Sequence, residues 1–80
     1  MNRVTVLSII VENIDSAASI NSILHDFGSY IIGRLGIPYH KKHVSVICIV
    51  LDAPVEISSA LSGKLGMLPG VTCKSLTSKV

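Results

Sequence analysis

Apolar runs of strand length and amphipathic segments of helix length follow one another along this chain. β-Branched and other aliphatic residues, which favour an extended backbone, dominate residues 3–11, 30–39, 43–51 and 71–76. Residues 14–27 and 54–65 instead repeat apolar side chains three and four positions apart, which places them on one face of a helix. The pattern predicts the element order β-α-β-β-α-β.

Each predicted helix carries one apolar stripe and a residue suited to its start. Asn13 can cap the first helix through its side-chain oxygen, and Pro54 suits the first position of the second. The stripe of the first helix comprises Ala17, Ile20, Ile23, Leu24 and Phe27. That of the second comprises Ile57, Ala60, Leu61 and Leu65. Both stripes are therefore expected to pack on a sheet.

The segment that joins the second helix to the last strand is rich in turn signals. Gly66 follows Leu65, the last residue of the helical stripe, at the position where a left-handed glycine commonly ends a helix. Pro69-Gly70 then turns the chain into the strand over 71–76. We expect a positive φ at Gly66.

The element order is that of the split β-α-β arrangement and predicts an α+β, ferredoxin-like fold with both helices on one sheet face. Right-handed crossovers place the first strand, 3–11, and the third, 43–51, at the centre of one antiparallel sheet. The strands over 30–39 and 71–76 then form the edges, so the sheet order is 4-1-3-2. Pro38, which cannot donate a ladder hydrogen bond, suits an edge strand.

The two central strands are apolar on both faces. The third strand alternates between two sets, Val44, Val46, Cys48 and Val50 on one side and Ser45, Ile47, Ile49 and Leu51 on the other. An antiparallel sheet with one solvated face should alternate apolar and polar residues, and a monomer rarely exposes an apolar patch above about 300–600 Å². The sequence therefore predicts a homo-oligomer, a dimer or a tetramer, that covers the second sheet face. Which of the two sets faces the partner stays open.

Composition narrows the class of protein. Charged residues make up 15% of the 80 residues, against roughly 25% in ordinary domains, and the net charge is only +2. The basic residues form no stripe, so we expect no direct contact with nucleic acid.

The longest unbroken apolar run, 46–51, is far shorter than the roughly 20 residues of a membrane span, and no secretory cleavage site follows Arg3. We expect a cytoplasmic protein, not bound to membranes, in which Cys48 and Cys73 are free thiols rather than a disulfide.

Two short segments are candidates for binding a small effector. Arg34 lies mid-strand in a chain poor in charge, opposite in parity to Ile31, Leu35 and Ile37, and nearby Gly36 would let a ligand approach closely. The alternative is an edge-strand arginine that discourages aggregation. Glu12 and Asn13 follow the first strand and could hold a polar ligand at the helix start, or simply cap it. The candidate effector site is Glu12, Asn13, Arg34 and Gly36.

Signals for metal binding and catalysis are weaker. His40 and His43 form a His-x-x-His pair that could hold a metal with ligands from a neighbouring subunit, or form a solvated hairpin turn. His25 suits the C-terminal end of the first helix, with a ligand role as the alternative. Gly63-Lys64 lacks the upstream glycine and the hydroxyl residue of a phosphate-binding loop. We expect no enzyme, no catalytic residues, no bound metal and no cofactor.

Four segments together resemble a known family. They are Ile-Ile-Val-Glu-Asn at 9–13, Leu-His-Asp-Phe at 24–27, Ile-Ile-Gly-Arg-Leu-Gly-Ile-Pro at 31–38 and Ala-Leu-Ser-Gly-Lys-Leu-Gly-Met-Leu-Pro-Gly-Val at 60–71. Nearly the whole chain is similar to the iron-only hydrogenase system regulators, small proteins of ACT-like fold. That fold is also similar to the ligand-sensing C-terminal domain of nickel-responsive repressors.

The resemblance implies a single ACT-like regulatory domain over residues 1–80 that senses a small effector as an oligomer. No ribbon-helix-helix or helix-turn-helix segment accompanies the predicted elements, so a role in transcription would need a partner protein. Two alternatives stay open: a structural interaction module for metalloenzyme maturation, and a metal-sensing ACT-like domain. The resemblance carries no ligand set onto His25, His40, His43, Cys48 or Cys73.

Overall fold

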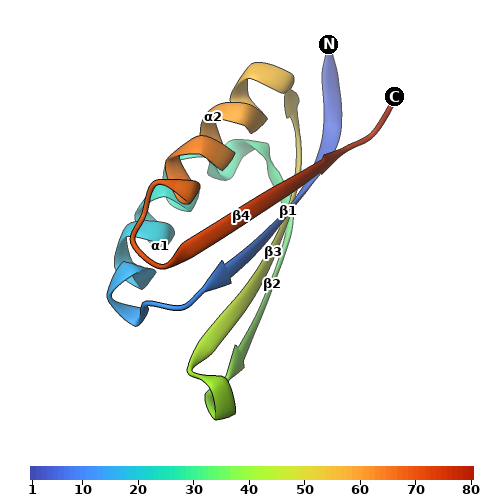
Figure 1. Ribbon diagram of the computed structural model, residues 1–80. Coiled ribbons are helices and arrows are strands. Elements are labelled where there is room, and N and C mark those ends of the chain that lie inside the picture. The colour runs from blue at the N-terminus through green and yellow to red at the C-terminus, as the bar shows by residue number, and fades with distance from the viewer.

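A computed structural model describes residues 1–80 and contains one antiparallel sheet with both helices on the same face (Figure 1). The strands are β1 (Asn2–Val11), β2 (Ile31–Tyr39), β3 (Val44–Pro54) and β4 (Val71–Thr77). The helices are α1 (Ala17–Asp26) and α2 (Val55–Gly66), and 3-10 turns occupy Ile14–Ser16, Gly28–Tyr30 and His40–Lys42. The sheet order β2-β3-β1-β4 is the predicted 4-1-3-2 order counted from the other edge, so the α+β, ferredoxin-like fold is confirmed.

The starts of the two helices differ slightly from the sequence prediction. Ile14–Ser16 form a 3-10 turn, at whose start the Asn13 side chain accepts a hydrogen bond from the Asp15 backbone N–H at 3.0 Å. Asn13 therefore caps this segment, and the α-helix proper follows from Ala17. β3 continues to Pro54, whose ψ of 147° is extended, so Pro54 precedes the second helix instead of opening it.

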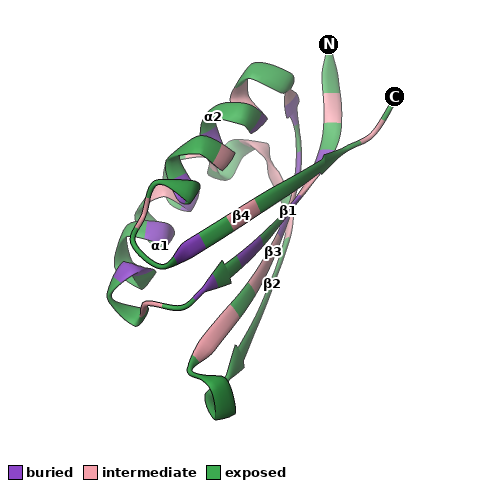
Figure 2. Cartoon of the chain, viewed as in Figure 1, coloured by how far each residue is buried: buried purple, intermediate pink, exposed green.

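The core lies between the helices and the inner face of the sheet (Figure 2). It consists of Leu7, Ile9, Val11, Ile20, Leu24, Ile49, Leu51, Ala53, Leu61, Leu65 and Val71. The helical stripes are narrower than predicted, because Ala17 and Ala60 are exposed. Ser58 is buried against the core instead, and its hydroxyl has no hydrogen-bond partner.

The register of the central strands decides which set of β3 faces outward. Ile49 pairs with Leu7, and both side chains are fully buried under the helices. Val46 pairs with Ile10 on the opposite face, where both are partly exposed, since directly paired residues share a face. The set that contains Val46, Cys48 and Val50 is therefore the one that the helices leave uncovered.

A β-bulge in β2 makes one detail of the predicted pattern wrong. The sequence pattern puts Ile31, Leu35 and Ile37 on one face. In the structure Ile31 pairs with Leu51 and Gly33 already pairs with Val50, so Ile32 is an extra residue. An extra residue reverses the faces of all that follow. Ile31 thus packs against the core, whereas Leu35 and Ile37 lie on the open face.

The expected positive φ at Gly66 is wrong. α2 continues through Gly66, and Met67 follows in right-handed geometry, with its N–H donating to the Leu65 carbonyl. The left-handed glycine is Gly70, with φ of 68°, in the turn with Pro69. The helix therefore unwinds gradually, and the chain reversal takes place four residues later than a C′ glycine would place it.

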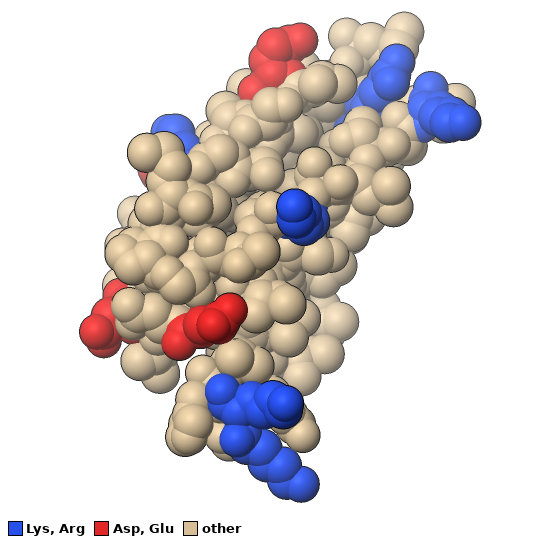
Figure 3. Space-filling model, viewed as in Figure 1, with Lys and Arg blue, Asp and Glu red and all other residues tan.

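Charged side chains are unevenly distributed over the surface. Figure 3 shows basic atoms gathered at the β2–β3 hairpin and at the end with the two chain termini, with few charged atoms between them on the sheet side. The hairpin turn itself contains Lys41 and Lys42. Cys48 and Cys73 are free thiols, as predicted. No helix of the structure has the length and apolar character needed to cross a membrane.

Candidate functional site

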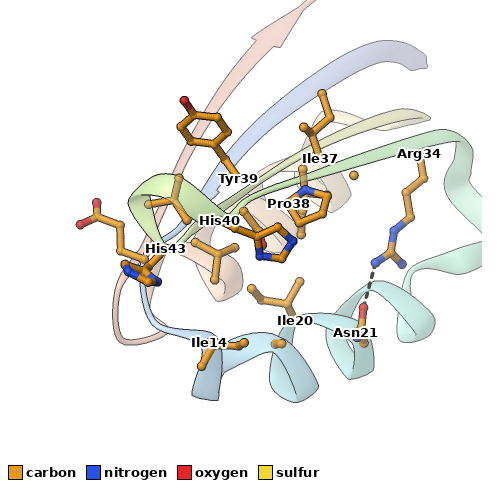
Figure 4. Close-up of a pocket in the computed structure, with 16 residues that line it drawn as sticks. Ile14, Ile20, Asn21, Arg34, Ile37, Pro38, Tyr39, His40 and His43 are labelled. Atoms are coloured by element: carbon orange, nitrogen blue, oxygen red, sulfur yellow. Dashed lines mark hydrogen bonds between the residues drawn. The ribbon is translucent and has the colours of Figure 1, made fainter.

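A cavity of about 560 Å³ opens between α1 and the end of the β2–β3 hairpin (Figure 4). The cavity exists because of the bulge in β2. After the bulge, Arg34, Gly36 and Pro38 lie on the sheet face that is turned toward the helices. None of these carries the aliphatic side chain that fills the core under the rest of the sheet. The hairpin therefore stands away from α1 and leaves a hollow at this end of the molecule.

The part of the cavity next to the core is apolar, whereas the rest of its lining mixes apolar and polar residues. Buried Val11 and Ile20, with half-buried Ile47, form the apolar side next to the core. The remaining lining comes from the β1–α1 loop, from α1, from β2 and from the start of β3 with the hairpin turn before it. Those residues are Glu12, Ile14, Ala17, Asn21, Arg34, Gly36, Ile37, Pro38, Tyr39, His40, His43, Val44 and Ser45.

Arg34 reaches across the cavity from β2 to α1. Its Nη2 donates a hydrogen bond of 2.8 Å to Oδ1 of Asn21 (Figure 4). A smaller hollow of about 380 Å³, lined by Leu24 and His25 among others, lies on the far side of this bridge. A guanidinium has five N–H donors, so this contact holds the group in place and leaves donors for an anionic ligand.

Glu12 lies in a loop that the β4 turn holds firmly. Its backbone N–H donates to the Gly70 carbonyl at 2.7 Å, and the Ser16 hydroxyl donates to the Pro69 carbonyl at 2.6 Å. The Glu12 side chain is exposed and lines the cavity. A carboxylate is thus available on a fixed loop, in the same hollow as the Arg34 cation.

The structure brings together three of the four residues proposed from the sequence. Glu12, Arg34 and Gly36 line one cavity, although they lie far apart in the chain. Asn13 does not line it, because its side chain caps the following turn and its backbone lies against Gly70. An effector-binding role for all four residues stays a prediction.

The histidines and cysteines are dispersed. His40 and His43 line the cavity from the hairpin turn, and His25 lies beside the second hollow. Cys48 is on the open sheet face, while the Cys73 sulfur lies 3.6 Å from the Ser62 hydroxyl under α2. No group of three or more His, Cys, Asp or Glu side chains in the structure could hold a metal ion.

Sequence reasoning missed the hairpin side of the cavity, above all Pro38, Tyr39 and Ser45. In Figure 4 Pro38 and His40 lie between the hairpin and α1, while Tyr39 and Ile37 point away from the helix. The sequence feature that indicates this side of the cavity is the series of non-aliphatic residues at alternate positions of β2. The feature is hard to recognise in the sequence, because the bulge at Ile32 shifts the alternation of faces by one residue.

Comparisons with known proteins find a family model and a solved structure that match nearly the whole chain. The model of the TM1266-like family, described as "Iron-only hydrogenase system regulator, putative", matches residues 3–75. The solved structure of uncharacterized protein TM1266 from Thermotoga maritima is similar with a TM-score of 0.94 and 32% sequence identity. The match covers 99% of this chain and 100% of that one. A search of curated proteins found no match.

A more distant likeness supports the fold alone. A formyltetrahydrofolate deformylase from Pseudomonas putida KT2440 matches 91% of this chain with a TM-score of 0.65 and 9% identity. The match covers only 28% of that larger enzyme. At this level of identity the arrangement of strands and helices is shared, and nothing follows about the reaction.

Proposed function

Because the chain belongs to the TM1266-like family of iron-only hydrogenase system regulators, we propose that it is an ACT-like regulatory module that senses a small effector in the cavity between α1 and β2. The observation that carries the proposal is that Arg34 and Glu12, from distant parts of the chain, line one partly apolar cavity. Its volume of about 560 Å³ lies in the range of small-molecule sites, roughly 300–1,000 Å³.

The chemistry of the cavity favours one class of effector. Arg34 offers N–H donors to an acidic group, and Glu12 offers an acceptor to an amino group or another donor. Val11, Ile20 and Ile47 suit an aliphatic or aromatic body. A small zwitterion with an apolar side chain, such as an amino acid, satisfies all three.

The module would act through a partner protein. The apolar stripes of α1 and α2 pack on the sheet, so neither helix stands out from the fold in the way a groove-reading helix does. We infer that effector binding alters a surface that a partner recognises, in an iron-only hydrogenase system. The cavity is a suitable place for such a change, because an effector bound there would contact Arg34, whose hydrogen bond to Asn21 joins β2 to α1.

A thermal-shift screen of amino acids, divalent metals and nucleotides tests the proposal. A ligand present at 100 times its Kd stabilises the folded state by about 2.7 kcal/mol, which raises the Tm of a domain of this size by about 10–20 °C. We expect such a rise with a zwitterion and its loss in Arg34→Gln and Glu12→Gln. Arg3→Gln, at the opposite end of β1, is the matched control and should keep the response.

Two other results would point elsewhere. A shift with a metal alone, abolished by His40→Ala or His43→Ala, would favour metal sensing at the same cavity. No shift with any class of ligand, or an equal shift in Arg34→Gln and the wild type, would contradict effector binding at this site.

A further inference from the structure

The open face of the sheet carries an ordered apolar surface that nothing in the single chain covers. Strand register divides it into rows that run across all four strands. The rows are Thr72–Ile10–Val46–Ile37, Lys74–Ser8–Cys48–Leu35 and Leu76–Val6–Val50–Gly33. Tyr39 and Val44 extend it at the hairpin end, and Val4 and Asp52 bound the other end. We call these residues the open face.

We propose that the open face is the contact surface for a second copy of this chain, packed sheet against sheet about a two-fold axis. The first support is its chemical character. Lys74 and Asp52 are its only charged residues, and both lie at its margin, Lys74 on an edge strand and Asp52 in the last row of the open face. The long side chain of Lys74 can carry its ammonium group past the rim of a contact into water.

The shape of the open face is complementary to itself. Its middle row has the small residues Ser8 and Cys48 on the two central strands, between ridges formed by Ile10 with Val46 and by Val6 with Val50. A contact about a two-fold axis must pair a surface with an identical copy. A furrow flanked by ridges meets that need, since a ridge of one sheet can lie in the furrow of the other.

The dimensions of the open face come close to those of a standard interface. With about 4.8 Å between strands and about 3.3 Å per residue, the rows from Asp52 to Val44 cover a flat area of roughly 500 Å². Side chains that stand above the sheet expose more than this projected area. The result approaches the roughly 800 Å² per partner that standard interfaces bury.

The edges of the sheet are poorer contact surfaces than its face. β2 carries Pro38, a bulge at Ile32 and Arg34, all features that discourage a further strand from pairing. The opposite edge, β4, is mostly polar and carries Lys74. Growth of the sheet by edge pairing is therefore disfavoured, and the apolar surface available to another copy is the open face.

The test compares two valines of similar exposure on opposite sides of the molecule. Val46 is 38% exposed on the open face, and Val55 is 45% exposed at the start of α2. We expect the wild type to sediment at the mass of a dimer or a larger assembly at micromolar concentration. Val46→Asp should lower that mass at least twofold with an unchanged far-UV circular dichroism spectrum, whereas Val55→Asp should keep it.

Native thiol chemistry gives a second readout that does not depend on an aspartate variant. In Cys73→Ser, the remaining thiol is Cys48 in the middle row of the open face. Its maleimide labelling rate should fall at least tenfold as the protein concentration rises through the dimer Kd. A wild type that is monomeric at micromolar concentration, a Val46→Asp variant that keeps the wild-type mass, or a Cys48 rate that is independent of concentration would each overturn the proposal.

Discussion

Single residues hold the loop that carries Glu12. Gly70 has φ of 68°, and a Cβ at this position would lie 2.6 Å from the Asn13 Cβ and 2.9 Å from its backbone nitrogen. The Gly70 carbonyl also accepts a hydrogen bond from the Glu12 backbone N–H. The turn before β4 is thus in direct contact with the β1–α1 loop, and only glycine fits there. Gly66 has no such role, since a Cβ at that position would meet nothing within 4 Å.

The two glycines therefore predict opposite effects of the same substitution. Gly70→Ala should destabilise the protein by about 2–4 kcal/mol, because it combines a strained left-handed alanine with overpacking against Asn13. Gly66→Ala should stabilise it by about 0.5–1 kcal/mol, since alanine favours a helix. Urea unfolding at one fixed protein concentration measures both. Equal losses would show that Gly66 also needs special backbone geometry.

At the scale of elements, the β2 bulge shapes both the cavity and the open face. The extra residue Ile32, 65% exposed, turns Arg34 and Gly36 toward α1, where they line the cavity. The same shift turns Leu35 and Ile37 to the open face. Because of this one extra residue, the aliphatic side chains of Leu35 and Ile37 lie on the open face instead of under α1.

A pair of deletions tests this role of the bulge. Removing Ile32 leaves Ile31 opposite Leu51 and Gly33 opposite Val50 in a regular ladder, so the downstream faces are kept. We expect this variant to fold with a Tm within about 5 °C of the wild type, a change of about 1 kcal/mol. Removing Leu35 instead reverses the faces on one side of the deletion and should lower the Tm far more. Similar losses in the two variants would contradict the assigned register.

At the scale of the whole molecule, the cavity and the open face share residues. Ile37, Tyr39 and Val44 line the cavity and also lie on the open face at the hairpin end. An effector and a second subunit would therefore contact the same hairpin. Two ligands that share a two-state element affect each other's affinity by the same factor.

This linkage predicts a measurable coupling, which rests on both proposals made above. The zwitterion that raises the Tm should tighten the dimer about 5-fold or more, because filling the cavity fixes the hairpin against α1 before the second copy binds. Sedimentation with and without the effector measures the change in dimer Kd, and Arg34→Gln should remove it. An unchanged dimer Kd at saturating effector would show that the two surfaces work independently.

The sequence by itself determined the elements, their order and the chemistry of their surfaces. Period-2 and period-3.6 patterns are local, so the strands, both helices and the Asn13 cap could be predicted without knowing any contact. The double apolar character of the first and third strands likewise indicated a second apolar face. Glu12, Arg34 and Gly36 were identified as candidates by their residue types and neighbours alone, and the structure places them in one cavity.

The tertiary structure decided everything that depends on which distant residues pair. The choice of Val46 over Ile47 for the open face follows from the pairing of β3 with β1, and no local pattern distinguishes two apolar sets. The reversed faces of β2 follow from an unpaired Ile32, which only the ladder with β3 reveals. Only the structure shows that Gly70 lies directly against Asn13, 57 positions earlier in the chain (70 − 13), so that no side chain fits there. Register, bulges and close approaches are set by packing between segments, so they first become visible when the segments are placed together.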